Sequence, residues 1–378
     1  MKPLMWTYLE TAGAAEIASV LREWRSETPR PGVLALVSEH AADRVPLLQQ
    51  CANQHALPLA GAIVPGLIAG AEFKKSGVLL AAHDASVPQA IIPLRRGAET
   101  PGGVAELAAF VETHACESGD DTLLLFIDAM TPDIASLLDN LYLHVGDRVR
   151  YAGTNVGSES FRPVPCLFDN TSFVEGAALA LMLPRHPGAC LAHRYCKTTP
   201  LCVATGAGGN RIAFIDGRPA FEAYRELIAQ AHGVELTREN FYRHAVHFPL
   251  ALHLAEGEPL VRIPVSVDEQ GCLHCVGEVP EASLLSVVEA ADPGSNETAR
   301  EIAGRMQRHA MAAALAFYCA GRLLHHGEDA AGGELRELQN ALAPVPLFGA
   351  LSLGEIANHQ GQGYPRFHNA TIVALPWR

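Results

Sequence analysis

Two side chains of opposite charge near the C-terminus could bind the two ends of a small zwitterion. Glu355 lies in the apolar, glycine-containing run "PLFGALSLGEI", and Arg322 follows another apolar run, Ala313 to Tyr318. A buried carboxylate needs a hydrogen-bonding or cationic partner, and arginine binds carboxylates through two parallel bonds. We therefore predict that Arg322 and Glu355 lie close together, either as contacts for an amino acid or as an ion pair that only holds a strand to a turn. Gly349 of the same run would let the backbone approach a ligand closely.

A polar loop follows this run in the sequence. The stretch "GYPRFHNAT" presents Tyr364, Arg366, His368 and Asn369 just before a predicted final strand. Loops beside strand ends commonly carry binding residues. Tyr364, His368 and Asn369 are therefore candidate ligand contacts, and the alternative is a turn in which the His and Asn only cap the strand entry.

Covalent and metal chemistry find little support in the sequence. "CLHC", at Cys272 to Cys275, is a single C-x-x-C in a predicted strand, where positions three apart point to opposite faces. A tetrahedral zinc site would need a second pair. "GAGGNR" lacks the third glycine of a dinucleotide loop and leads into a strand. We predict no catalytic residues and no metal site, with Cys272 and Cys275 as free thiols.

The elements that must position these residues repeat along the chain. "PLAGAIVPGLI", from Pro58 to Ile68, resembles "PLFGALSLGEI", and a fainter copy, "RYAGTNVGSESF", begins at Arg150. In all three copies the predicted order is strand, helix, glycine-bearing strand, loop and strand. This order predicts three related α/β units with Gly61, Gly153 and Gly349 at equivalent places. The alternative is chance similarity in a chain rich in Ala, Leu and Gly.

Different elements lie between the second and third units. The pattern predicts a hairpin of Leu201 to Thr205 with Arg211 to Ile215, and then a helix beginning at Pro219. A second hairpin is predicted from Val261 to Val267 and Cys272 to Val276. We predict an α/β fold of repeated strand-helix-strand-strand units that form mixed sheets in two domains.

Composition narrows the classes of partner. The 378 residues are 49% hydrophobic, which is enough for a large core, and 28 Lys and Arg against 41 Asp and Glu give a net charge of -13. That charge disfavours nucleic acid and anionic membranes. The chain has no apolar stretch long enough to cross a bilayer, and nine scattered cysteines suit a reducing compartment. We predict a cytoplasmic location, with neither nucleic acid nor membrane as a partner.

The combination and order of several segments resembles the FIST proteins of bacteria. The segments are "NRIAFIDGRPAFEAYRELI", "FYCAGR", and "PLFGALSLGEIAN" running into "GYPRFHNATIVALP". The resemblance implies a FIST N-terminal-like domain at 31–190, with two α/β units, and a FIST C-terminal-like domain at 219–375, with a helix, a hairpin and the third unit. Pro65 and Leu67 stand in the first copy where the last copy has Leu353 and Glu355, so only the last unit retains the acidic residue.

This resemblance implies a sensory role in signal transduction. Members are thought to bind small ligands, with amino acids the usual suggestion, and to act through linked or separate signalling proteins. Because the chain contains no recognisable output region, we expect a separate partner such as a histidine kinase or a cyclase. The alternatives are a nitric-oxide sensor that binds haem without a covalent bond and acts on a histidine kinase, and an enzyme acting on a small metabolite.

Haem, if bound, would need an axial ligand. "NFYRHAVHFPLALH" places His244 and His247 among aromatic and aliphatic residues, and one imidazole facing an apolar slot is enough for a proximal ligand. The alternative is that both histidines lie on a half-buried helix face with no ligand. No other cofactor is expected.

Overall fold

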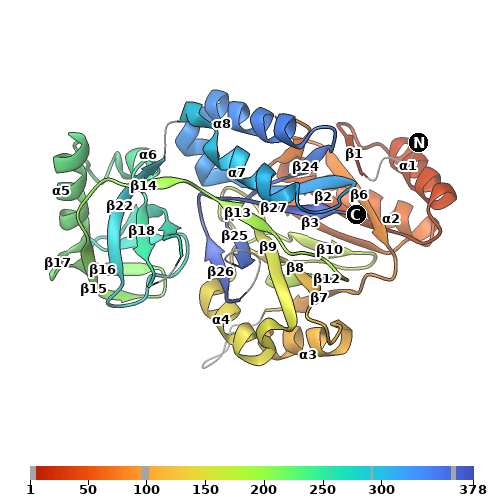
Figure 1. Cartoon of the computed structure of the whole chain (residues 1–378), viewed down its shortest axis with the longest axis horizontal. Coiled ribbons are helices and arrows are strands. Elements are labelled where there is room, and N and C mark those ends of the chain that lie inside the picture. Colours follow the sequence, from red (N-terminus) through yellow and green to blue (C-terminus); the bar gives the residue numbers. More distant parts are fainter. Residues whose placement is uncertain (1–5, 95–101, 256, 291–292, 359–362) are drawn as a thin grey trace.

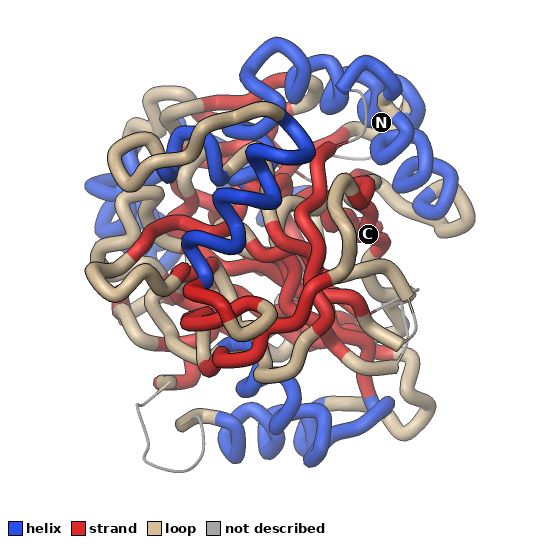
Figure 2. Tube along the Cα trace, turned by 90° about the vertical axis from the view of Figure 1, so that its left-hand side faces the viewer, coloured by secondary structure: helices blue, strands red, loops and turns tan. Residues whose placement is uncertain are grey.

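Three units with the same order of elements form the body of the protein. The computed structural model describes residues 6–94, 102–255, 257–290, 293–358 and 363–378. Each unit has an edge strand, a helix, a strand, a second helix, a parallel strand, a short hairpin and a final antiparallel strand. The helix pairs lie at three places around the strands in Figure 1, and Figure 2 shows the strands gathered in the middle with helices outside.

Unit one shows why the sequence forms these elements. All eight residues of its first central strand are buried, as expected for a strand covered on both faces, and the following helix buries Val45, Leu48, Cys51 and Ala52 on one side. The elements of unit one are β1 (Trp6–Leu9), α1 (Ala14–Glu27), β2 (Pro31–Ser38), the 3₁₀ helix η1 (Glu39–Arg44), α2 (Val45–Gln54), β3 (Leu59–Val64), β4 (Leu67–Ala69), β5 (Glu72–Lys74) and β6 (Val78–Asp84).

Units two and three repeat this order. Unit two contains β7 (Gln89–Pro93), α3 (Val104–His114), β8 (Asp121–Asp128), α4 (Ile134–Val145), the 3₁₀ helix η2 (Gly146–Arg148), β9 (Val149–Val156), β10 (Leu167–Asp169), β11 (Phe173–Val174) and β12 (Ala177–Leu183). Unit three contains β13 (Cys190–Ala192), the 3₁₀ helix η3 (Pro293–Ser295), α7 (Glu297–Met306), β23 (Ala313–Cys319), α8 (Ala320–Leu342), β24 (Leu347–Ser352), β25 (Glu355–Asn358), β26 (Pro365–His368) and β27 (Ile372–Trp377). Helix α8 is interrupted at Gly327, whose φ of 76° is not helical.

Each unit gives its hairpin to the sheet of another unit. The β4–β5 hairpin of unit one extends the sheet of unit three, β10–β11 of unit two extends that of unit one, and β25–β26 of unit three extends that of unit two. The result is a cyclic exchange among three six-stranded mixed sheets. None of the units therefore forms its full sheet alone.

The repeated glycine is required where two parallel strands approach each other. Gly61, Gly153 and Gly349 pair with Ala35, Leu125 and Ala316 at the same register of the three sheets. A Cβ atom on Gly349 would lie 1.8 Å from the Ala316 carbonyl oxygen, and one on Gly153 would lie 2.0 Å from that of Leu125. The prediction that the three glycines are equivalent is confirmed.

The core joins all three units through alternating side chains. In β8, Leu123, Leu125 and Ile127 pack with α3 and α4, whereas Leu124 and Phe126 point to the opposite face and enter a core shared by all three units. Phe126 meets Phe317 of unit three there, with ring centroids 5.7 Å apart. The three units therefore form one body around a common centre.

A second module is inserted into unit three between β13 and α7. It lies at the left of Figure 1 and has a hydrophobic cluster of its own. Its elements are β14 (Tyr195–Lys197), β15 (Cys202–Gly208), β16 (Arg211–Ile215), β17 (Arg218–Pro219), α5 (Ala220–His232), α6 (Phe241–Ala245), β18 (Leu250–His253), β19 (Leu260–Arg262), β20 (Pro264–Val267), β21 (Leu273–Cys275) and β22 (Leu284–Ala290). We call residues 195–290 the inserted module.

The mixed α/β fold with several mixed sheets is confirmed. The two predicted hairpins and the helix after Pro219 are present in the inserted module. The division at 31–190 and 219–375 stays a prediction, and the packing groups residues differently because unit three belongs with the first two units rather than with the inserted module.

Candidate functional site

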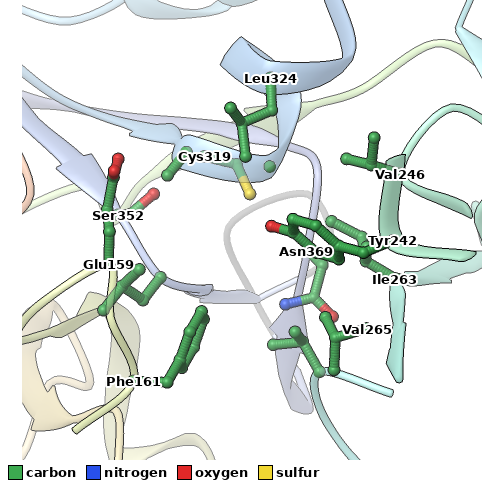
Figure 3. A pocket seen from close by; sticks show the side chains of 14 residues that line it. Glu159, Phe161, Tyr242, Val246, Ile263, Val265, Cys319, Leu324, Ser352 and Asn369 are labelled. Atoms are coloured by element: carbon green, nitrogen blue, oxygen red, sulfur yellow. The ribbon is translucent and has the colours of Figure 1, made fainter. Parts of the chain in front are cut away.

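A pocket opens where the central strands of unit three end against the inserted module. Cys319 ends β23, Ser352 ends β24, and both line a cavity of about 570 Å³, a volume that includes its open mouth. Tyr242 and Val246, in and just after α6, close the opposite side, as Figure 3 shows. We call this cavity the unit-three pocket. Its position at the carboxyl ends of strands is where α/β sheets commonly bind ligands.

The floor of the pocket rests on a fully buried carboxyl group. Ser352 Oγ donates to Glu355 Oε1 at 2.5 Å, and Thr371 donates to Oε2 from Oγ1 at 2.7 Å and from its backbone N–H at 3.3 Å. Burial raises the pKa of Glu355 to about 7, although these hydrogen bonds favour the ionised form. Glu355 can therefore gain or lose a proton near neutral pH, one hydrogen bond away from the pocket.

Cys319 completes this floor from the neighbouring strand. Its Sγ accepts the backbone N–H of Ala370 at 3.1 Å and faces the cavity in Figure 3. Burial and the nearby Glu355 carboxylate raise the pKa of the thiol. The thiol therefore stays protonated near neutral pH and is a weak nucleophile.

Asn369 reaches the pocket from the turn between β26 and β27. Its side chain is 1% exposed, and its Oδ1 atom has no hydrogen-bond partner in the protein. A buried amide oxygen without a partner costs free energy, so its presence at a cavity indicates a donor supplied from outside the chain. Asn369 is thus the predicted ligand contact that the structure places in this pocket.

The mouth of the pocket is apolar and open to solvent. Phe161, Tyr242 and Leu324 are 42%, 48% and 52% exposed, and all three line the pocket. Large apolar side chains that gather around an opening indicate a binding site more than scattered ones do. A polar floor beneath an apolar mouth suits an amphipathic small molecule.

The predicted pairing of Arg322 with Glu355 is wrong. Arg322 forms a bidentate ion pair with Glu334 of α8, with Nε–Oε2 and Nη2–Oε1 distances of 2.9 and 2.7 Å. Its remaining N–H groups donate to the carbonyl oxygens of His193 and Ala370 and to Thr298 Oγ1. All five donors are therefore used, and the guanidinium has none left for a ligand.

Three other predicted contacts lie away from the unit-three pocket. Gly349 is in the middle of β24 against Ala316, and Tyr364 lies on Tyr142 of α4, with ring centroids 4.3 Å apart. His368 is buried in β26, and burial lowers its pKa to about 3, so the ring is neutral. Their role in ligand binding stays a prediction without support from the geometry.

The two candidate haem ligands are half-buried beside the pocket rather than in its wall. His244 lies in α6 and His247 just after it, where its ring is 5.2 Å from that of His325. Burial lowers the pKa of His247, as does the nearby His244. Among the described residues, no three His, Cys, Asp or Glu side chains are arranged to hold a metal ion.

A second cavity of about 1000 Å³, again counting its mouth, opens at the end of unit two. It shares Phe161, Val265, Val276 and Leu353 with the first, so the two cavities adjoin. Asn155 and Thr131 line it and have buried side-chain oxygens without a protein partner. We call it the unit-two pocket.

Two buried or half-buried charged groups attach the inserted module to the body. Glu278 accepts the N–H groups of Ala135 and Ser136 at the start of α4, at 2.5 and 3.1 Å. Arg262, 2% exposed, donates to the carbonyl oxygens of Glu278 and Phe367. These polar contacts therefore join the pocket walls contributed by the module to the body.

The other lining residues have only weak signals in the sequence. Cys319 and Ser352 were recognisable as the ends of predicted strands, but Phe161, Tyr242 and Leu324 come from three distant segments. Local patterns do not show that such segments meet. Only the repeat, which predicts converging strand ends, could have suggested Cys319 and Ser352.

Comparison with known proteins identifies a family. The FIST N domain matches residues 33–218, and the FIST C domain matches residues 220–358. No curated protein matches the chain. One similar solved structure is a cyanuric acid hydrolase from A. caulinodans, with 13% identity over 77% of this chain and 99% of that chain, and a TM-score of 0.20. A score this low supports no statement about function.

Proposed function

Because the chain belongs to the FIST family, we propose that it is a sensory protein in bacterial signal transduction that binds a small ligand in the unit-three pocket. The observation that carries this proposal is the unpartnered buried oxygen of Asn369 at the floor of a pocket with an exposed apolar mouth. FIST domains are associated with sensing and with small-ligand binding.

The position of the pocket suits a sensor because both parts of the protein form its wall. Cys319, Ser352 and Asn369 belong to the body, whereas Tyr242 and Val246 belong to the inserted module. A ligand that contacts both parts favours the arrangement in which both contacts are made. Binding can therefore change how the module sits on the body, which a separate signalling protein such as a histidine kinase or cyclase would detect.

We propose binding rather than catalysis as the task of this site. The Cys319 thiol has a raised pKa and is therefore a weak nucleophile. We also propose a cytoplasmic location. Among the described residues, every helix is too short or too polar to cross a membrane.

The first test measures whether small molecules stabilise the folded protein through this pocket. Thermal unfolding is followed with a panel of small molecules that contains both the free amino acids and uncharged amides, for the wild type and for Leu324→Glu, which places a charge at the half-exposed mouth. Leu143→Glu, on the exposed face of α4, is the matched control because Leu143 is 75% exposed and outside the pocket. We expect a ligand-dependent rise in Tm that Leu324→Glu abolishes and Leu143→Glu retains.

Haem binding is the second candidate, because His247 lies beside the pocket in an apolar segment. Protein produced with haem supplied is scanned for a Soret band, and His247→Ala is compared with His244→Ala. A band that shifts only in His247→Ala would favour the haem sensor. No band in the wild type would exclude haem and leave the small-ligand proposal to the thermal test.

A further inference from the structure

The unit-three pocket offers hydrogen bonds but no positive charge. Among its described lining residues there is no lysine, arginine or histidine, and the one acid, Glu159, lies at the exposed rim. Arg322 lies close behind the floor, but all five of its donors are bonded within the protein. The floor presents a carboxamide, a hydroxyl and a thiol, from Asn369, Ser352 and Cys319.

We propose that the ligand of this pocket has an uncharged polar head of the carboxamide type on an apolar body. The inference rests on the proposed function and specifies the ligand class of that same site. An amide head carries both a donor and an acceptor, which the free Oδ1 and the amide nitrogen of Asn369 can match. The apolar body lies between Phe161, Tyr242 and Leu324 at the mouth.

Charged heads fit this floor poorly. A carboxylate would lose its hydration without meeting a cation, and the Glu355 carboxyl lies one hydrogen bond behind Ser352. An ammonium group would lose its hydration without contacting a carboxylate at the floor, because Ser352 lies between the pocket and Glu355, and Glu159 is at the rim. A free amino acid carries both charges at its head and therefore differs from the ligand that this pocket favours.

Three probes that share one apolar body test the head group. They are 3-phenylpropanamide, 3-phenylpropanoate and 3-phenylpropylamine, and their dissociation constants are measured on the full chain by calorimetry or ligand-observed NMR. We expect the amide to bind at least about tenfold more tightly than either charged probe. Equal or tighter binding of the carboxylate or the amine would overturn the proposal.

Asn369→Asp tests whether this residue selects the head group. The substitution keeps the shape of the side chain and adds a negative charge, so we expect preference to move from the amide probe to the amine probe by about tenfold. Asn155→Asp is the matched control, since Asn155 also has a buried unpartnered Oδ1 but lines the unit-two pocket. A shift of equal size in Asn155→Asp would place the selection elsewhere and overturn the assignment.

The remaining outcomes separate this inference from the proposed function. If Asn369→Asp does not fold, the ranking of the three probes on the wild type decides alone. If a free amino acid raises the Tm of the wild type but not of Leu324→Glu, and no probe binds at millimolar concentration, the head-group proposal is overturned and the sensory pocket stands. If neither amino acids nor probes bind, both proposals fail.

Discussion

Units one and three have the same strand pairing beside the repeated glycine, but the side chain at that position is apolar in unit one and acidic in unit three. Leu67 of β4 pairs with Ala350, and Glu355 of β25 pairs with Thr154, one residue beyond the repeated glycine in both sheets. In unit two the equivalent residue is Leu167, paired with Ala62. At this position units one and two therefore have an apolar side chain, whereas unit three has a carboxyl group. The prediction that only the last unit retains an acid here is confirmed.

The repeated scaffold requires the glycine and the strand pairing, and it leaves the neighbouring side chain free to vary. The glycine and the strand pairing recur because they determine whether the sheets can form at all. The side chain one position away can become polar where partners exist, and unit three supplies Ser352 and Thr371 for Glu355. Val64 and Val156 end the corresponding strands of units one and two.

Replacing the shared glycine should have the largest effect. Gly349→Ala and Gly153→Ala would each bring a Cβ atom to about 2 Å from a backbone oxygen of the paired strand, so the strands must separate. We expect a loss of about 4 kcal/mol or more in the free energy of unfolding, measured by urea denaturation.

Gly304→Ala provides the control for this comparison. Gly304 lies on the exposed side of α7, where an added Cβ meets no atom within 4 Å. We expect it to stabilise the protein by up to about 1 kcal/mol, because alanine favours the helix. If Gly349→Ala cost no more than 1 kcal/mol, the glycine would not explain the repeat.

Breaking the buried ion pair of unit three should rank next. Glu334→Gln leaves the Arg322 guanidinium, 2% exposed, without its counter-charge, and we expect a loss of about 3 to 5 kcal/mol. Glu337→Gln on the same helix breaks the more exposed pair with Arg300 and should cost less than about 1 kcal/mol. If Glu334→Gln and Glu337→Gln lost the same free energy of unfolding in urea denaturation, burial would not be what makes the first ion pair more important.

The Glu355 carboxyl should make stability depend on pH in a defined direction. Burial raises its pKa from 4.5 to about 7, so the folded state binds the proton more tightly than the unfolded state. The stabilisation is full below about pH 4.5 and is lost as pH rises through 7, by up to about 3 kcal/mol. We expect the wild type to lose stability relative to Glu355→Gln between pH 5 and pH 8.

The control for the pH series is Glu112→Gln, an exposed position on α3. The difference between this variant and the wild type should stay flat over the same range. A flat difference for Glu355→Gln as well, in melts recorded across that range, would show that Glu355 does not titrate there.

The smallest effect is expected from replacing Ser352 of unit three with the valine that units one and two have at the equivalent position. Ser352→Val matches Val64 and Val156 and removes one hydrogen bond to Glu355, which should cost about 1 kcal/mol. A double-mutant cycle with Glu355→Gln isolates that bond. A coupling energy near zero would mean that Thr371 alone supports the carboxyl group.

Much of the fold could be predicted because its signals are local. Buried runs such as residues 33–37 and 123–127 read as strands, and the glycine repeat identified three units at the correct register. The exchange of hairpins could not be predicted, because strand periodicity does not state which unit supplies the neighbouring strand. The insertion in unit three could not be predicted either, because β13, the strand of unit three that precedes it, is only three residues long.

The site could be predicted only in part. Asn369 was found because it lies in a polar loop just before a predicted strand, and the structure places it in the pocket. The partner of Arg322 was missed because Glu334 and Glu355 are both acids that follow it in the sequence, and the local pattern does not distinguish them. The interruption of α8 at Gly327, between Arg322 and Glu334, decides which acid meets the guanidinium. The mouth was not predictable, because exposure depends on how distant segments pack.

The exchanged hairpins also determine the order in which the chain can fold on the ribosome. The sheet of unit one needs only β1 to β11, so it can assemble once the first half of the chain has emerged. The sheets of units two and three need β25 to β27, so until these strands have been synthesised β9 and β13 present open edges. Such non-local pairing slows folding and leaves edges that attract other strands. We expect nascent chains of this protein to depend on chaperones until β27 has emerged.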